Sequence, residues 1–201
     1  MKYIALMLLA AWLLIGCHSS TQTTDFQNGD VIFHTSTSRQ SKMIQEVTDS
    51  KYSHVGIIFL KDGKRFVFEA VQPVKITPLE KFIGRGVDAK YTVMRYQEEL
   101  SDDEMTRMYN YASAQLGKDY DLRFEWSEER IYCSELVFKI YESAGIELCD
   151  KHTFRDYDLS SESARRAIEK RYNTDINLEE EVVTPEDLFE SSAFYEVFDN
   201  Y

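Results

Sequence analysis

Two apolar segments joined by a short polar turn constrain the fold of this chain more than any other feature. Residues 55–60 read VGIIFL, residues 66–71 read FVFEAV, and the pair Asp62-Gly63 lies between them. An Asp-Gly pair is typical of the two-residue type I′ turn. The two segments are therefore predicted to pair as an antiparallel β-hairpin.

The register of this hairpin brings two ionisable side chains together. Counting outward from the turn places Gly56 opposite Glu69 and His54 opposite Val71, so His54 and Glu69 lie diagonally on one face. Diagonal neighbours are ~7–8 Å apart, within reach of long side chains, and Gly56 has no side chain to separate them. A carboxylate among apolar residues is costly unless it is paired. We expect Glu69 to orient the imidazole of His54, whereas a register slip of one residue would separate them.

The remaining segments predict an α+β fold in which a small, mostly antiparallel sheet packs against helices. Further strands are expected at residues 31–33 and 91–96, and helices at residues 38–48, 101–116, 133–144 and from Thr184 onward. No internal repeat, low-complexity segment or Gly/Pro/Ser-rich linker interrupts residues 26–201. These residues are read as a single domain.

The helix expected after residue 100 begins with a recognisable cap. Ser101 is followed three residues later by Glu104, which is the pattern of a capping box. Its apolar residues recur at helical spacing and are expected to face the core; they are Met105, Met108, Tyr109, Ala112 and Leu116.

The first residues have the pattern of an export signal. Residues 4–15 are apolar and uncharged, a run too short to span a bilayer but typical of a signal-peptide core. Residues 14–17 (LIGC) resemble a bacterial lipobox, in which a peptidase cuts before the cysteine and Cys17 receives lipid. Residues 1–16 are thus predicted to be a lipoprotein signal peptide, and residues 17–25 a lipidated cysteine with a polar tether. The mature protein is expected in the bacterial cell envelope, on the periplasmic or outer-membrane face, with membrane contact through that lipid only.

Charge and residue spacing argue against two classes of partner. The chain of 201 residues carries a formal net charge of −12, whereas nucleic-acid binding depends on Lys and Arg neutralising phosphates. No His, Cys, Asp or Glu cluster has the spacing of a metal site. Neither nucleic acid, nor a metal, nor another cofactor is expected.

Cys133 lies where a loop becomes an amphipathic helix, and it is expected to be a free thiol. A helix that begins there rises ~1.5 Å per residue, which carries Cys149 too far away for a disulfide, whose Cα atoms lie within about 7 Å. A free thiol at a helix start is either a small buried hydrophobe or a nucleophile whose thiolate the helix stabilises. The residues alone leave both readings open.

A nucleophilic cysteine needs a base, and the chain offers four histidines. His54 is the best candidate because Glu69 is predicted to orient it. His34 ends a strand and is left open, His152 lies in a polar stretch and is expected at the surface, and His18 adjoins the lipidation site.

Four motifs, in a rotated order, resemble those of NlpC-type cell-wall hydrolases. Those papain-like enzymes carry a Leu-Gly-Lys-Pro-Tyr stretch, an Asp-Cys-Ser-Gly motif that opens a helix, a Pro-Gly-Asp strand and a His-Val-Gly-Ile strand. The corresponding segments here come in the order NGDVIF at residues 28–33, SHVGI at 53–57, LGKDY at 116–120 and YCSEL at 132–136. The chain therefore resembles the YaeF/YiiX group of circularly permuted papain-like amidases. It departs from the ordinary enzymes at Asp119, Tyr132 and Glu135, where they have Pro, Asp and Gly.

The resemblance implies a thiol hydrolase that cleaves an amide bond in peptidoglycan or another small peptide. Cys133 would be the nucleophile, His54 the base and Glu69 its orienting partner. The candidates for oxyanion or substrate contacts are Tyr120, Tyr132 and Ser134. Glu135 is expected to face solvent or to pair with Arg130.

Two other functions remain open from the sequence. One is a thiol acyltransferase or lipid hydrolase of the lecithin:retinol acyltransferase-like kind, although the Asn-Cys-Glu-His-type motif of those proteins is absent. The other is a non-catalytic ligand-binding lipoprotein that keeps the papain-like cleft.

Overall fold

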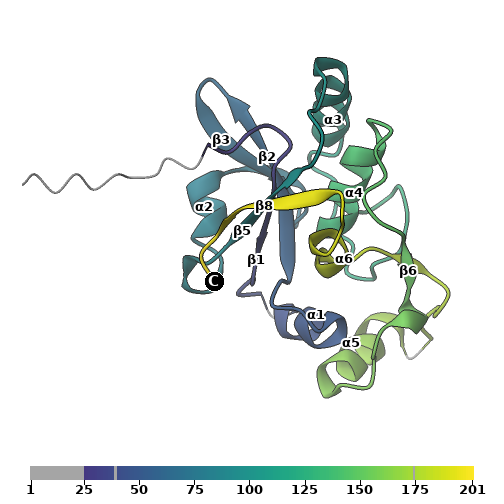
Figure 1. Ribbon diagram of the computed structural model, residues 1–201. Helices are drawn as coiled ribbons and strands as arrows, with labels where there is room; N and C mark the ends of the chain where they lie inside the picture. The colour runs from purple at the N-terminus through teal and green to yellow at the C-terminus, as the bar shows by residue number, and fades with distance from the viewer. Residues whose placement is uncertain (1–24, 39, 174) are drawn as a thin grey trace, which may run out of the picture.

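A six-stranded antiparallel sheet organises the computed structural model (Figure 1), which describes residues 25–38, 40–173 and 175–201. The strands lie in the order β4-β3-β2-β1-β5-β8. Their bounds are β1 Val31–His34, β2 His54–Lys61, β3 Lys64–Glu69, β4 Lys75–Pro78, β5 Thr92–Tyr96 and β8 Phe194–Asp199. A short second sheet pairs β6 His152–Thr153 with β7 Glu181–Val182. The α+β fold with its antiparallel sheet is confirmed.

The central hairpin has the predicted register. Lys61 pairs with Lys64 and Ile57 with Phe68 across β2 and β3. Asp62 and Gly63 both have positive φ, 51° and 70°, as a type I′ turn requires. This turn fixes which side chains of the two strands share a face.

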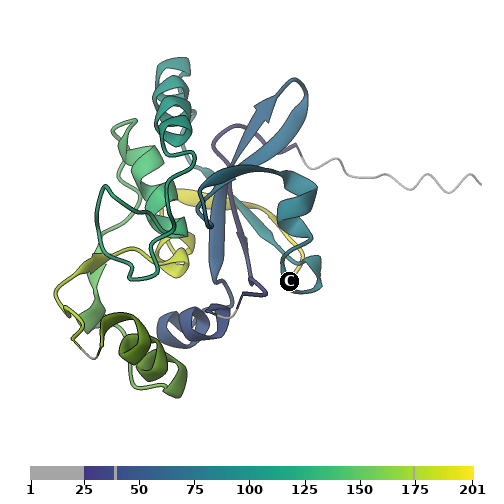
Figure 2. The same cartoon turned by 180° about the vertical axis from the view of Figure 1, so that it is seen from behind.

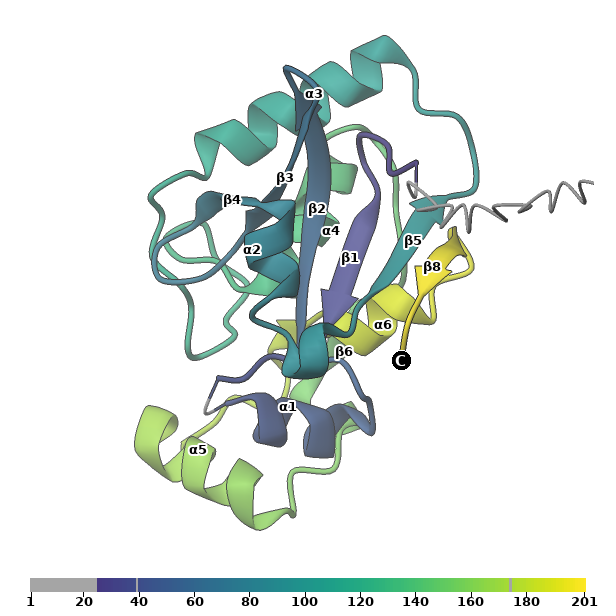
Figure 3. The ribbon, with the colours of Figure 1, turned by 90° about the vertical axis from the view of Figure 1, so that its left-hand side faces the viewer.

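Helices cover both faces of the sheet. Their bounds are α1 Ser41–Thr48, α2 Leu79–Ile83, α3 Asp102–Ala114, α4 Cys133–Glu142, α5 Glu162–Tyr172 and α6 Pro185–Phe189. In Figure 3, α2 lies in front of the sheet and α4 behind it. Buried apolar residues accordingly form two clusters, a large one that includes α4 and a small one around Phe82 of α2.

A separate layer lies beside the sheet at one end of the molecule. Figures 1 and 2 both show α1 and α5 side by side there, far apart in sequence but packed together. The chain between α4 and α6 supplies α5 and the short strands β6 and β7. This layer covers the end of the sheet at which β2 begins.

Helix starts agree with their sequence signals. Ser101 accepts a hydrogen bond from the backbone N–H of Glu104 while the Glu104 carboxylate accepts one from that of Ser101, so the capping box is confirmed. Thr184 caps α6 in the same way, with Pro185 at the first helical position. Within the described residues, no helix has the length and apolar character needed to cross a membrane.

The expected core stripe of α3 is only partly buried. Met108 and Ala112 are fully buried, but Tyr109 is 37% exposed and Leu116 is 42% exposed. The helix ends at Ala114, so Leu116 lies beyond the last turn and no longer follows the helical spacing. Tyr109 lies at the rim of the core. The expected signal peptide and Cys17 fall outside the described residues.

Gly56 is needed for close packing at the start of the hairpin. A Cβ atom there would lie 2.4 Å from Cγ1 of Val67 and 2.9 Å from the carbonyl oxygen of Phe68. Gly56→Ala is expected to lower the free energy of unfolding by ~1–3 kcal/mol because the core is overpacked. Urea denaturation measures this as a lower midpoint with an unchanged slope. An unchanged midpoint would contradict this packing.

Candidate active site

Cys133 is the first residue of α4. Tyr132 before it has extended backbone angles, φ −104° and ψ 172°, so the helix begins at the cysteine. The unpaired N–H groups of a helix start carry partial positive charge, which favours a thiolate. The thiol is free and 2% exposed.

The position of Glu135 differs from the one that the sequence predicted. It faces neither solvent nor Arg130 but is fully buried, and its carboxylate lies 2.9 Å from the ammonium of Lys139. It also accepts a hydrogen bond from the backbone N–H of Tyr132 at 3.2 Å. Glu135 therefore fixes the helix start that presents Cys133, while burial raises its own pKa to about 7.

His54 and Glu69 meet as their register predicts. Nε2 of His54 lies 2.8 Å from Oε2 of Glu69, and both side chains are buried. Because Nε2 is occupied, Nδ1 is the ring nitrogen left for the sulfur of Cys133, with which the imidazole interacts. The structure thus brings Cys133, His54 and Glu69 together.

Two further groups, not identified from the sequence, hold Glu69. Arg85, in the loop after α2, donates to both carboxylate oxygens at 2.5 and 2.6 Å. Thr77 of β4 donates to Oε1 at 2.5 Å. Four hydrogen bonds therefore surround a carboxylate that has no exposed surface, as a buried charge requires.

The electrostatics of the site favour a thiolate paired with an imidazolium. Burial alone would lower the pKa of His54, but Cys133 and Glu69 outweigh it and raise that pKa to about 9. Burial opposes ionisation of Cys133, yet His54, the backbone N–H of Val55 and Tyr120 together lower the pKa of its thiol. Burial likewise disfavours the Glu69 carboxylate, but His54, Arg85 and Thr77 lower its pKa to about 2.

Tyr120 lies against the sulfur, whereas Tyr132 and Ser134 point elsewhere. The Tyr120 hydroxyl interacts with Cys133 and accepts a hydrogen bond from Nε2 of Gln40 at 3.0 Å. The hydroxyl of Tyr132 accepts from the backbone N–H of Val183, and that of Ser134 donates to the Val183 carbonyl at 2.7 Å. Tyr132 and Ser134 thus anchor the helix start, and of these three hydroxyls that of Tyr120 is the one beside the sulfur.

The other histidines take different positions. His34 is buried beside His54, with ring centroids 5.2 Å apart, and stacks on Phe82 at 4.4 Å. Burial, with the nearby charges of His54 and Arg85, lowers its pKa to about 3, so His34 is neutral. His152 is exposed, beside Asp187.

The chain matches one family model over nearly all of its described length. The model is that of the permuted papain-like amidase enzymes of the YaeF/YiiX group, and it covers residues 25–198.

Two relatives extend the comparison. An uncharacterised protein, YiiX of Escherichia coli, is 42% identical over 166 residues, which is 82% of each chain. A crystal structure of YiiX from a second strain of Escherichia coli has 40% identity and a TM-score of 0.83, covering 87% of this chain and 98% of that one. That protein is described as a metalloprotein. In the described part of the present chain, no three His, Cys, Asp or Glu side chains are grouped so that they could hold a metal ion.

The pairing of Cys133 with His54 is tested by alkylation. His54→Ala is expected to raise the apparent pKa of Cys133 by about one unit or more, because the thiolate loses its main stabilising cation. The rate of iodoacetamide labelling of Cys133, followed across pH by mass spectrometry, reports this pKa. Identical profiles for the two proteins would remove His54 from this role.

The ion pair between Arg85 and Glu69 is tested by stability. Breaking a buried pair costs ~3–5 kcal/mol, but the Arg85 side chain is 39% exposed. Solvent screening reduces this cost, so Arg85→Met is expected to lower the free energy of unfolding by ~1–3 kcal/mol. Arg85→Lys, which keeps the positive charge, is the matched control and should lose less. Equal urea midpoints for Arg85→Met and the parent would contradict this assignment.

Proposed function

This chain belongs to the family of permuted papain-like amidases, and we propose that it is a hydrolase that cleaves an amide bond through Cys133. The observation that carries the proposal is the meeting of Cys133, His54 and Glu69, with Glu69 held by Arg85 and Thr77. A structural cysteine would need no imidazolium beside it. A nucleophile does.

In the proposed reaction, protonated His54 acts as the acid and the Cys133 thiolate as the nucleophile. The Cys133 thiolate attacks the carbonyl carbon of the amide, and a carbon–sulfur bond forms. His54 donates its Nδ1 proton to the leaving nitrogen as the carbon–nitrogen bond breaks, which leaves a thioester on Cys133. A water molecule then gives a proton to His54 and attacks the thioester, which releases the acid and restores the thiolate–imidazolium pair.

Two hydrogen-bond donors lie beside Cys133 and could stabilise the negative charge that develops on the carbonyl oxygen. The backbone N–H of Cys133 lies at the helix start, where no intrahelical acceptor serves it. The Tyr120 hydroxyl lies against the sulfur, and burial raises its pKa well above the usual range, so it keeps its proton. Groups of this kind stabilise such an oxyanion by ~2.7–4 kcal/mol each.

We also propose that the protein acts at the bacterial cell envelope. Residues 1–16 have the pattern of a lipoprotein signal peptide, and Cys17 stands where lipid is attached. The enzyme would then be exported and held at the cell envelope by its lipid. Amide bonds of peptidoglycan fragments or other small peptides are substrates available there.

Hydrolysis or transfer of acyl groups is the second candidate. It would use the same thioester on Cys133. The observation that favours it is an apolar cavity to which Cys133 contributes. A binding protein without catalysis is disfavoured by the buried pairing of His54 with Glu69, which a binding site does not need.

A panel of small peptide amides and N-acyl amines tests the proposed activity. Activity should rise with pH through the lowered pKa of Cys133 and fall as His54 loses its proton at about pH 9, which gives a bell-shaped profile. Cys133→Ala should lose about 10³-fold or more in kcat, and a thioester trapped at low pH should appear on Cys133 by mass spectrometry. Turnover that survives Cys133→Ala would refute the proposal.

A further inference from the structure

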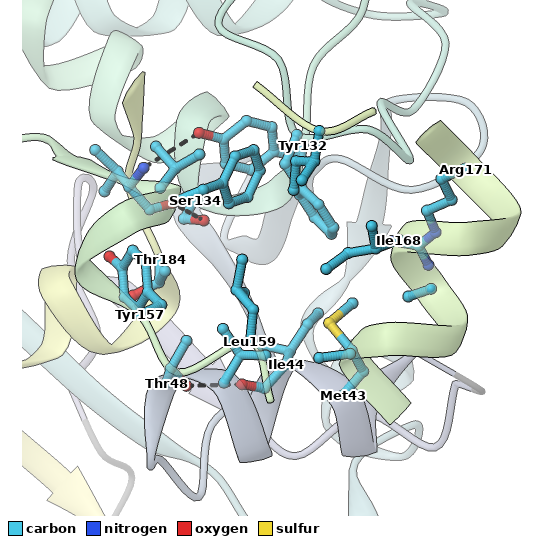
Figure 4. Close-up of a pocket in the computed structure, with 18 of the residues that line it drawn as sticks. Met43, Ile44, Thr48, Tyr132, Ser134, Tyr157, Leu159, Ile168, Arg171 and Thr184 are labelled. Atoms are coloured by element: carbon cyan, nitrogen blue, oxygen red, sulfur yellow. Dashed lines mark hydrogen bonds between the residues drawn. The ribbon is translucent and has the colours of Figure 1, made fainter. Parts of the chain in front are cut away.

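The ring nitrogens of His54 face two groups whose positions are fixed. Nε2 lies 2.8 Å from the carboxylate of Glu69, and the imidazole also interacts with the sulfur of Cys133. Figure 4 shows what holds that sulfur in place, since the neighbouring hydroxyls of Tyr132 and Ser134 are hydrogen-bonded to the chain. These contacts engage the edges of the imidazole, so its faces must be stabilised by other groups.

Two aromatic rings, those of Phe82 and His34, lie against the ring of His54. Phe82 of α2 stacks on it, with 5.5 Å between ring centroids and 26° between ring planes. His34 of β1 lies 5.2 Å from it, with 34° between planes, and stacks on Phe82 at 4.4 Å. The face of an aromatic ring carries partial negative charge and attracts a cation within about 6 Å of its centroid. Both rings are therefore close enough to stabilise an imidazolium at His54.

Strand pairing sets the position of His34. It pairs directly with His54 across β1 and β2, and side chains that are directly opposite in such a pair have Cβ atoms about 4.5–5.5 Å apart. Both side chains lie on the face of the sheet that α2 covers, where Phe82 is fully buried. The three rings thus form one buried aromatic group.

His34 joins this group as a neutral ring. Burial and the charges of His54 and Arg85 lower its pKa to about 3, so it is not a second cation. Its Nδ1 is buried and has no hydrogen-bond partner among the described residues, and leaving a buried polar atom unpaired costs stability. The absence of a side chain at Gly86 admits the ring, since a Cβ atom there would lie 3.0 Å from Nδ1. The contacts that remain to explain a ring at this position are those with His54 and Phe82.

Few charged or titratable groups face His54. Glu69 comes from β3 and Cys133 from α4, while Tyr120 contacts the sulfur and Arg85 contacts the carboxylate. Burial by itself lowers the pKa of His54. An aromatic face opposes this effect without adding a charge that would compete with Cys133 or Glu69.

We propose that Phe82 and His34 are positioning residues that hold His54 in its protonated form by presenting their ring faces to the imidazolium. This inference goes beyond the proposed function, because it concerns the protein without substrate. In the proposed reaction, the same contacts would keep the proton on Nδ1 until the leaving nitrogen accepts it. Neither ring exchanges a proton itself.

Position 34 is tested with and without a ring. His34→Leu keeps an apolar side chain but removes the ring face, so the pKa of His54 should fall by about 0.5–1.5 units. His34→Phe keeps a neutral face and should leave that pKa close to the value of the parent. Nuclear magnetic resonance of ¹⁵N-labelled histidine measures the pKa, and urea denaturation shows whether each variant folds. No fall in folded His34→Leu, or an equal fall in His34→Phe, would overturn the inference.

Phe82 is tested by the same loss of a ring. Phe82→Leu should also lower the pKa of His54. Phe26→Leu is the matched control, since Phe26 belongs to the same small apolar cluster but its ring contacts are with Tyr91 and Phe198. The control should leave the pKa of His54 unchanged. Equal falls in the two variants would trace the effect to general loss of packing and would contradict a specific role of Phe82.

A measurement without the sulfur separates the inference from the proposed function. In Cys133→Ala the imidazolium has lost its thiolate, yet adding His34→Leu should lower the pKa of His54 further, because the ring acts on the cation directly. A fall that occurs only when the sulfur is present would overturn this direct effect. If the parent hydrolyses no amide but the fall is seen in both backgrounds, the proposed function fails and the role of the rings stands.

Discussion

A carboxylate with no exposed surface, that of Glu69, is the group around which the active-site region is built. A buried charge is tolerated only when cations and hydrogen-bond donors surround it. The hairpin places His54 within 2.8 Å of Glu69, β4 supplies Thr77, and the loop after α2 supplies Arg85. The Cys133 thiolate and the ionised Glu69 together keep a second proton on the imidazole of His54, and the resulting imidazolium in turn stabilises the thiolate.

The proposed chemistry also depends on where α4 begins. Glu135 and Lys139 form a buried pair in the first turns of the helix, and Ser134 is bonded to the backbone of Val183. These contacts leave Cys133 little freedom to move away from His54. The charged triad and the apolar cavity therefore adjoin the same cysteine.

The sequence predicted the parts of the site that depend on local rules. The Asp62-Gly63 turn determines the register of the hairpin, and period-two alternation then brings His54 and Glu69 to one face. The edge strands β4 and β8 were not predicted, because β4 is short and ends in proline and β8 gains its partner, β5, from a distant segment. Arg85 was missed since a loop arginine gives no local signal of the carboxylate it will bind. Glu135 was assigned to the surface because its burial depends on Lys139 and on the packing of α4.

The thiolate–imidazolium pair of Cys133 and His54 can be tested by measuring the protonation state of His54. Nuclear magnetic resonance of ¹⁵N-labelled histidine, with His54→Gln to assign the signals, reports whether each ring nitrogen carries a proton. We expect both nitrogens of His54 to stay protonated up to about pH 9. A ring that loses its proton near the ordinary histidine value of about 6.5 would contradict the thiolate–imidazolium pair.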